Sequence, residues 1–400
     1  MVRQFAELQN GERVSGRPKS DTGFRTVRKL FDTRPRMSIP ADSEAITPTW
    51  LTAVLHEAGA LDQARVTSIE SAPIGQLGFT GQIWRLQIGC DKPEPGAPRS
   101  LVAKFSATNP EAREAVHSMG FYEREIGFYR ELAADCPVRT PRCYFGEVEM
   151  DSGASLLLLE DLSWMHNLNS AGGSVDESEL VIREVAKLHA AWWGDARLDQ
   201  IPWLAMRGML TADEAPLVFT QNWERFLDKL SIPVTQELLA AGDVCRRYLR
   251  AVSVAMYLEP PRTLIHNDVQ GDNLLVAEDG ELSLAVVDWQ LTTAARPAPD
   301  LARFLVGHLE TTERRRHENR LLEMYHSLLI ECGVAGYSMK QCWDDYRMAL
   351  VLAASRLATA VGFLPGLTAT PGGFWNVVFP RYAQALADLG VAELLQERYG

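Results

Sequence analysis

Three oxygen-bearing side chains, set at short intervals, carry the clearest chemical signal in the sequence. Asp268 lies five residues before Asn273, and Asp288 follows an apolar segment typical of a β-hairpin. In phosphoryl transfer, one carboxylate orients the attacking hydroxyl and accepts its proton, while an amide and a second carboxylate hold Mg²⁺ on the triphosphate. The spacing therefore predicts a phosphoryl-transfer site, with Asp268 as catalytic base and Asn273 and Asp288 as metal ligands.

A lysine and a glutamate upstream fit the same chemistry. Lys104 lies among apolar residues of a predicted strand, where a lysine is out of place unless it is paired. In a kinase such a lysine holds the α- and β-phosphates, and a glutamate on a helix holds the lysine. Glu125 is the predicted partner, because Glu123 falls on a different helical face. The alternative is a lysine at a strand edge and a solvated glutamate.

A glycine-rich turn between two predicted strands contains Gly75, Gly78 and Gly81. Its backbone N–H groups could lie over phosphates, although its spacing is one residue longer than that of a GxGxxG core. A glycine turn alone is a weak signal, and it matters here because Lys104 follows at a suitable distance. The sequence has no GxxxxGK[ST] motif, which disfavours a P-loop nucleoside triphosphatase.

The end of a leucine-rich strand, at Glu160 and Leu162, is a second candidate for nucleotide binding. If two lobes join at this point, backbone groups of the two residues would hydrogen-bond the edge of an adenine. The alternative is an ordinary charged strand end.

Histidine and tryptophan side chains near the predicted site allow two interpretations. His266 opens the loop that carries Asp268, and holding that loop by hydrogen bonds is a more common role than acting as a base. His189 could line an acceptor pocket, although a histidine packed in the core is more common. The same two interpretations apply to Trp192, Trp193 and Trp289.

The elements that must position these side chains change type along the chain. Strands with one long helix at 111–132 dominate before residue 160, and helices dominate after residue 163. This order predicts an α+β, two-lobe, protein-kinase-like fold with a small antiparallel β-rich N-lobe and a larger, mainly α-helical C-lobe. The predicted parts are a basic, disordered tail at 1–40, a nucleotide-binding lobe at 41–162 and a catalytic and acceptor-binding lobe at 163–400. The predicted strands are 66–74, 83–88, 101–105, 143–149 and 156–160, and the main helices before the loop of Asp268 are 177–193, 213–230 and 234–258.

Composition narrows the class of partner. The net charge of −12 argues against a nucleic-acid binder, which needs clustered Lys and Arg, and no apolar run approaches the roughly 20 residues that span a membrane. The six cysteines show no metal-binding spacing, so we expect reduced thiols in a cytoplasmic protein. Residues 1–37 hold nine Lys or Arg against four Asp or Glu, and Met37 is an alternative start.

These segments together resemble the aminoglycoside phosphotransferase and ecdysteroid-kinase-like family. That family is a branch of the protein-kinase-like fold that includes choline and fructosamine kinases. The His-x-Asp-x4-Asn motif with a following Asp-Trp is its most specific feature. The matching segments are the glycine turn, Val102-Ala103-Lys104, Glu125-Ile126-x-x-Tyr129, Leu159-Glu160-Asp161-Leu162, Leu188-His189-Ala190, His266-x-Asp268, Asn273, Val287-Asp288-Trp289 and Asp300-Leu301-Ala302.

The resemblance implies ATP, or GTP in some members, together with Mg²⁺ and transfer to a hydroxyl of a small molecule. The acceptor would be an antibiotic, a natural product or a metabolite, and no motif identifies it. Family members usually have glycine between the histidine and the aspartate, where this chain has Asn267. That departure could alter the loop backbone without removing a reacting group.

Two other functions remain open. A protein kinase is disfavoured, because only eleven residues separate Asp288 from Asp300 and no Ala-Pro-Glu follows. A pseudokinase that only binds nucleotide is disfavoured by retention of Lys104, Asp268 and both predicted metal ligands. We expect a monomer or homodimer that contacts neither nucleic acid nor membrane.

Overall fold

The computed structural model describes residues 38–75, 80–168, 172–204, 210–278, 282–363 and 373–400, so the predicted basic tail lies almost wholly outside the described residues. Contacts divide the chain into two compact units. Among the described residues, the β-unit lies within 38–168 and 271–293, and the helical unit lies within 172–270 and 294–400. This division differs from the predicted boundary at 162/163 chiefly because segment 271–293 groups with the β-unit.

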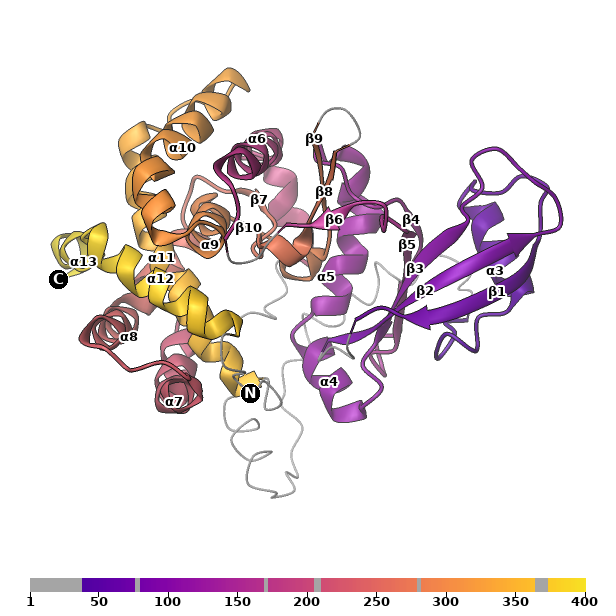
Figure 1. Cartoon of the computed structure of the whole chain (residues 1–400), viewed down its shortest axis with the longest axis horizontal. Helices are drawn as coiled ribbons and strands as arrows, with labels where there is room; N and C mark the ends of the chain where they lie inside the picture. The colour runs from indigo at the N-terminus through magenta and orange to yellow at the C-terminus, as the bar shows by residue number, and fades with distance from the viewer. Residues whose placement is uncertain (1–37, 76–79, 169–171, 205–209, 279–281, 364–372) are drawn as a thin grey trace. The chain divides into compact units, whose positions relative to one another are not determined.

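The β-unit contains an antiparallel sheet whose strand order in the described residues is β1-β2-β3-β5-β4 (Figure 1). Each predicted strand in this region is confirmed to within a few residues. β-Branched and aromatic residues favour the strand in β2 and β4, whereas β5 is a short run of buried leucines. The strands are β1 (Val66–Pro73), β2 (Gly81–Cys90), β3 (Ser100–Ser106), β4 (Cys143–Val148) and β5 (Ser155–Glu160).

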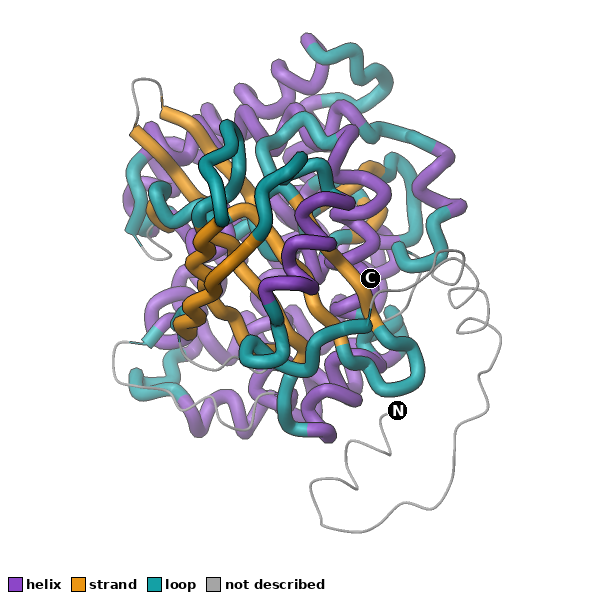
Figure 2. Tube along the Cα trace, turned by 90° about the vertical axis from the view of Figure 1, so that its right-hand side faces the viewer, coloured by secondary structure: helices purple, strands orange, loops and turns teal. Residues whose placement is uncertain are grey.

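Alternation along β3 separates the two faces of this sheet. Ala103 and Phe105 are buried and belong to the core that the sheet forms with α3 (Pro48–Glu57), which lies over the strands (Figure 2). Thr47 caps α3 by accepting a hydrogen bond from the N–H of Trp50, as its sequence predicts. Lys104 points to the opposite face, because successive side chains of a strand alternate.

The segment after β3 is a broken helix. α4 (Pro110–Ser118) ends before Gly120, which has a φ of 68°, and α5 (Phe121–Gly127) begins directly after this glycine. A π-helical turn, η1 (Phe128–Leu132), continues α5. The prediction of one long helix over 111–132 is therefore wrong, because a left-handed glycine interrupts the ladder of helical hydrogen bonds.

A smaller sheet carries the predicted metal ligands. β8 and β9 form an antiparallel hairpin in which Leu274 lies opposite Val286. Asn273 precedes the first strand and Asp288 follows the second, so the hairpin places both at its same end. The strands of this sheet are β6 (His166–Asn167), β8 (Leu274–Glu278) and β9 (Leu282–Val286).

The helical unit is built around α11, which packs against α7, α8, α9 and α12 (Figure 1). The strand pair β7 (Thr263–Ile265) and β10 (Thr293–Ala295) lies beside the loop of Asp268 in the sequence. Within the described ranges, every helix is too short or too polar to cross a membrane. The helices are α6 (Val175–Ala191), α7 (Glu214–Lys229), α8 (Gln236–Tyr257), α9 (Ala298–His308), α10 (Thr311–Glu331), α11 (Met339–Phe363), α12 (Phe374–Asp388) and α13 (Val391–Tyr399).

Candidate active site

Lys104 makes two ion pairs inside the β-unit. Its Nζ donates to Oε1 of Glu125 at 2.6 Å and to Oδ1 of Asp288 at 3.0 Å. The three side chains come from β3, from α5 and from the segment after β9, so the fold brings together residues that are far apart in the sequence. Glu123, the neighbouring acid on α5, pairs with His117 instead.

Burial and proximity set the charges of this group. The pKa of Glu125 is raised to about 7 because burial disfavours the carboxylate, an effect that Lys104 opposes and Asp288 increases. Burial alone would lower the pKa of Lys104, but the two carboxylates hold that pKa above its usual range. Lys104 therefore stays charged at neutral pH, which a group that holds phosphate oxygens requires.

Asn273 and Asp288 are joined through the backbone at the end of the β8–β9 hairpin. The N–H of Val287 donates to the carbonyl of Asn273 at 3.0 Å. Asp288 has a left-handed φ of 67°, and its Oδ2 accepts a hydrogen bond from Nε2 of Gln290 at 3.2 Å. The side chain of Asp288 keeps 28% of its surface exposed, whereas Asn273 is buried.

This donor set fits Mg²⁺. The ion prefers hard oxygen ligands and usually takes one or two protein side chains, with phosphate and water oxygens completing its shell. One carboxylate and one amide oxygen at the end of a hairpin supply such a partial set. Among the described residues no three His, Cys, Asp or Glu side chains are arranged as a metal site.

Trp289 anchors the segment that carries Asp288. Its ring stacks on Phe128 with centroids 3.7 Å apart and planes at 6°, and the side chain is fully buried. Arg124 of α5 adds a hydrogen bond from Nη1 to the carbonyl of Gln290 at 3.4 Å. The burial of Trp289 does not support the acceptor-pocket interpretation and makes this residue part of the support for Asp288.

The glycine turn is only partly within the described residues. Gly75 has a left-handed φ of 69°, while Gly78 lies outside the described residues. Gly81 is required by packing, because a Cβ at this position would lie 2.1 Å from the carbonyl oxygen of Phe105. Tyr122 of α5, which the sequence did not single out, donates its hydroxyl to the carbonyl of Thr80 at the end of the turn.

The strand end at Glu160 and Leu162, predicted to bind the edge of an adenine, has some of its backbone groups hydrogen-bonded within the protein. The N–H of Glu160 donates to the carbonyl of Arg142, and the carbonyl of Leu162 accepts from the N–H of Met165. The side chain of Glu160 binds Arg139 at 2.8 Å. The N–H of Glu160 and the carbonyl of Leu162 therefore already have partners within the protein, and adenine binding by this segment stays a prediction.

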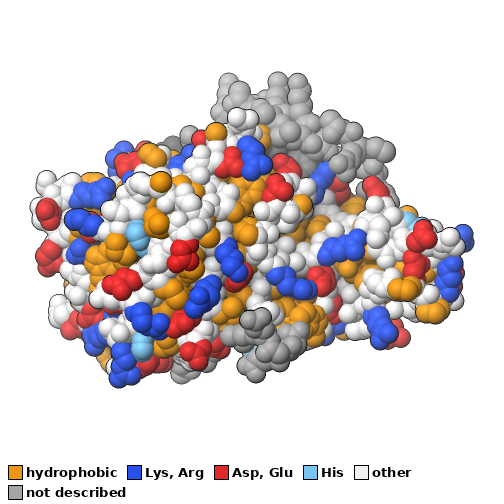
Figure 3. Space-filling view, turned by 90° about the horizontal axis from the view of Figure 1, so that it is seen from above, with side chains coloured by type: hydrophobic (Ala, Val, Ile, Leu, Met, Phe, Trp, Pro, Cys, Tyr) orange, Lys and Arg blue, Asp and Glu red, His pale blue; other side chains and the backbone are white. Residues whose placement is uncertain are grey.

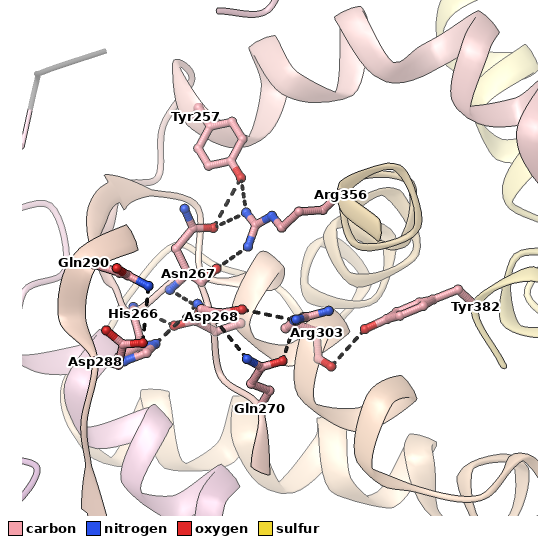
Figure 4. A network of polar contacts seen from close by, with 11 residues as sticks. Tyr257, His266, Asn267, Asp268, Gln270, Asp288, Gln290, Arg303, Arg356 and Tyr382 are labelled. Atoms are coloured by element: carbon pink, nitrogen blue, oxygen red, sulfur yellow. Dashed lines mark hydrogen bonds and ion pairs between the residues drawn. The ribbon is translucent and has the colours of Figure 1, made fainter. Parts of the chain in front are cut away.

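The carboxylate of Asp268, in the helical unit, is held at both oxygens. Nε of Arg303 donates to Oδ1 at 3.2 Å, and Nε2 of Gln270 donates to Oδ2 at 3.2 Å. Nη2 of Arg303 also donates to Oε1 of Gln270 at 2.6 Å, which closes a ring of three side chains (Figure 4). Burial would lower the pKa of Arg303, but Asp268 and Tyr382 raise that pKa, so the arginine stays charged.

The backbone of the loop is fixed by Asp300 of α9. Its two carboxylate oxygens accept the N–H groups of His266 and Asn267 at 2.9 and 2.6 Å. Nδ1 of His266 accepts the N–H of Asp268 at 3.3 Å, which is the loop-holding role expected for this histidine. Nε2 of His189 lies 3.2 Å from Oδ2 of Asp300, so His189 helps to hold the same carboxylate.

The residues predicted as an acceptor pocket are mostly packing residues. His189 is fully buried between Asp300 and the hydroxyl of Tyr325. Trp192 is 2% exposed, and Trp193 is half-buried against Tyr337 at 5.0 Å between ring centroids. Burial therefore favours the core interpretation for His189 and Trp192.

Several residues of the site carry no local signal in the sequence. Arg303 and Arg356 each follow Asp268 by more than thirty residues, and Phe128 precedes Trp289 by more than one hundred. Of the supporting residues, Asp300 was recognisable from the sequence because it lies in the Asp-Leu-Ala segment. Conservation of the others among relatives would be the signal that identifies them.

Comparisons with known proteins identify a family and a similar fold. The sequence model of the ecdysteroid kinase-like family matches residues 77–334. No curated protein matches the chain. A choline kinase structure from Cryptosporidium parvum has a TM-score of 0.54 at 11% identity, covering 87% of this chain and 98% of that one. This likeness confirms the predicted protein-kinase-like fold.

Two further structures are similar over most of their length. An ethanolamine kinase from Plasmodium vivax has a TM-score of 0.47 at 12% identity, with 95% of this chain and 96% of that chain covered. A choline kinase from Streptococcus pneumoniae has a TM-score of 0.44 at 14% identity, with 86% and 99% covered.

Proposed function

Because the chain belongs to the ecdysteroid kinase-like family, we propose that it moves the γ-phosphate of ATP to a hydroxyl group of a small molecule. The observation that carries this proposal is the bridge that Lys104 forms between Glu125 and Asp288. A half-buried lysine held by two carboxylates is costly to form, and phosphate binding gives it a use. The structural relatives that are small-molecule kinases support the general activity.

The roles of the residues follow from their chemistry. Asp268, fixed by Arg303 and Gln270, orients the acceptor hydroxyl and takes its proton as the phosphoryl group departs. Lys104 holds phosphate oxygens, and Glu125 keeps the lysine in place. Mg²⁺, when bound at Asn273 and Asp288, neutralises charge that develops on the phosphates.

The nucleotide and the setting are part of the proposal. We propose ATP, with GTP as the alternative, and Mg²⁺ as the ion. On the face seen in Figure 3, basic and acidic side chains are interspersed, which supports the expectation that nucleic acid is not a partner. A cytoplasmic monomer or homodimer remains the expected state.

The candidate acceptors are the small molecules for which similar kinases are named. The relatives are named for choline, ethanolamine, aminopropanol and aminoglycosides, and the family for ecdysteroids. Inactivation of an antibiotic and modification of a metabolite are both consistent with such a site. Identifying the acceptor will decide between inactivation of an antibiotic and modification of a metabolite.

A transfer screen tests the proposal. The full-length protein is incubated with Mg²⁺ and [γ-³²P]ATP and with each of those alcohols, nucleoside antibiotics, macrolides and steroids. Transfer to an acceptor, or slow release of phosphate to water, is expected from the natural sequence. Asp268→Asn is the matched control, and it should bind MgATP in a thermal-shift assay without transferring phosphate.

The competing functions give different results in the same experiment. A nucleotide-binding module would show the MgATP thermal shift with neither transfer nor release of phosphate. A protein kinase would label protein rather than the small alcohols. Absence of any MgATP-dependent shift would contradict the proposal itself.

A further inference from the structure

Asn267, which directly precedes the proposed catalytic base, has a backbone conformation that is costly for most residues. Its φ is 66°, in the left-handed region, and the residue is 1% exposed. The left-handed region is unfavourable for a residue with a Cβ, while glycine adopts it freely. Asparagine tolerates this region better than most residues, but a buried, strained residue persists only when its surroundings hold it.

Two residues from different helices hold Asn267. Arg356 of α11 donates from Nη1 to the carbonyl oxygen of Asn267 and from Nη2 to its Oδ1 at 2.7 Å. Tyr257, at the end of α8, donates its hydroxyl to the same Oδ1 at 3.2 Å and accepts from Nη2 of Arg356 at 3.0 Å. Figure 4 shows both side chains converging on Asn267, while Arg303 approaches Asp268 from another direction.

The guanidinium of Arg356 donates to Asn267 and to the hydroxyl of Tyr257. No carboxylate pairs with Arg356 in the part of the chain that the structure describes. Hydrogen bonds from a charged donor are roughly twice as strong as neutral ones. A half-buried guanidinium would ordinarily gain more from a carboxylate, so its position on a carbonyl oxygen points to a specific task.

The carbonyl that Arg356 holds belongs to the peptide bond between Asn267 and Asp268. That peptide is planar, so fixing its oxygen fixes the N–H and the Cα of Asp268 as well. Arg303 and Gln270 fix the other end of Asp268, at its carboxylate. The residue is therefore held at its backbone by one helix and at its side chain by another.

We propose that Arg356 and Tyr257 are positioning residues for Asp268, acting through the left-handed conformation of Asn267. The inference rests on the proposed phosphotransfer function, in which Asp268 is the base. Neither residue touches the reacting atoms. Their side-chain contacts stabilise at position 267 a conformation that glycine would adopt without support. The rate of phosphoryl transfer therefore depends on α11.

A pair of variants tests this role. The probe is MgATP with water as acceptor, followed by phosphate release from the full-length protein. Arg356→Met should lower kcat roughly 10- to 100-fold, because small misplacement of a reacting group has effects of this size. KM for ATP should change less than about twofold, since the contacts of Lys104 are untouched. Adding Asn267→Gly to Arg356→Met should restore most of the lost rate, because glycine needs no support at this φ.

Arg347 provides a matched control on the same helix. It also donates to backbone carbonyls, those of Leu389 and Gly390, both at 2.7 Å. Arg347→Met should lower the melting temperature without lowering kcat. Tyr257→Phe, which removes a single hydroxyl, gives a milder second variant if Arg356→Met does not fold, and it should lower kcat by about threefold with a similar rescue by glycine.

Hydrogen exchange separates failure of this inference from failure of the proposed function. If the natural protein neither releases nor transfers phosphate, the proposed function is wrong, but exchange of the peptide 263–273 still reports on the loop. Faster exchange in Arg356→Met, reversed by Asn267→Gly, supports the positioning role. An unchanged kcat with unchanged exchange, or a loss that glycine does not reverse and that Arg347→Met reproduces, overturns it.

Discussion

The charged group of the β-unit and the loop of Asp268 in the helical unit are built in opposite ways. In the β-unit, Lys104 holds two carboxylates by direct ion pairs between functional side chains. In the helical unit, residues of no direct chemical use hold the loop, and Asp300 and Arg356 do so in part through its backbone. The first region keeps its geometry through the charges it uses, while the second depends on residues from the surrounding helices α8, α9 and α11.

Backbone strain marks both regions. Among the described residues, the non-glycine residues with positive φ are Asn267 and Asp288. Such strain collects at sites where one conformation must be imposed. Asp288 is held by Lys104 and by Gln290 through its own carboxylate, whereas Asn267 is held by Arg356 and Tyr257. A left-handed backbone is thus stabilised at Asp288 partly by Lys104, which has a proposed role in phosphate binding, and at Asn267 by two residues that have no proposed contact with the substrate.

The largest effect should come from the base itself. Asp268→Asn removes the proton acceptor but keeps the shape of the side chain, so transfer should fall on the order of 10³-fold. Binding of MgATP should be nearly unchanged, because the ion pairs of Lys104 belong to the other unit. Rates of transfer and calorimetric binding of nucleotide measure the two quantities. Equal activity of Asp268→Asn and the natural protein would contradict the assignment of transfer to the helical unit and of nucleotide binding to the β-unit.

Lys104→Met should produce the next largest effect and the opposite pattern. Loss of the cation leaves Glu125 and Asp288 without the charge between them, and kcat/KM for ATP should fall about 100-fold. Nucleotide binding should weaken in the same experiment, unlike in Asp268→Asn. Lys92→Met, at an exposed position of the same unit, is the control and should leave both quantities unchanged. Normal nucleotide binding by Lys104→Met would contradict the phosphate-holding role.

The sequence revealed the β-unit site more fully than the helical one. Lys104 and Asp288 could be recognised because a lysine in an apolar strand and an Asp-Trp after a hairpin are locally unusual. Gly120 also carried a local signal, yet its effect on the helix was missed, because a glycine within a helical pattern is often tolerated. Arg303 and Arg356 could not be found, since an arginine on an amphipathic helix resembles any solvated arginine until the helices pack.

A smaller effect should appear in the pH dependence of stability in the β-unit. The pKa of Glu125 is raised from 4.5 to about 7, with burial as the main cause. The folded protein therefore binds this proton more tightly than the unfolded chain, and the resulting stability is present below about pH 4.5 and lost as pH rises through about 7.

Glu125→Gln cannot titrate and isolates this contribution. Its free energy of unfolding relative to the natural protein should increase between pH 5 and pH 8, by at most about 3 kcal/mol. Urea unfolding of the metal-free proteins at the two pH values measures the difference. A gap that stays constant, or that moves in the other direction, would show that Glu125 is already charged at pH 5.

The smallest effect should come from Arg303→Lys, which tests whether the helical unit needs charge or geometry. Lysine keeps the positive charge beside Asp268, but it lacks the planar fork that reaches Asp268 and Gln270 together. We expect kcat to fall about tenfold with KM for ATP unchanged, because the carboxylate keeps its charge but loses one of its two fixed directions.

Gln270→Ala is the companion to this variant, since it removes the bond to the other carboxylate oxygen and leaves the charge of Arg303 in place. Similar losses in both variants would indicate that the direction of the carboxylate matters more than the charge near it. If Arg303→Lys retains full activity while Gln270→Ala does not, the charge is sufficient on that side. The helical unit would then resemble the β-unit, where a single ammonium group already serves two carboxylates.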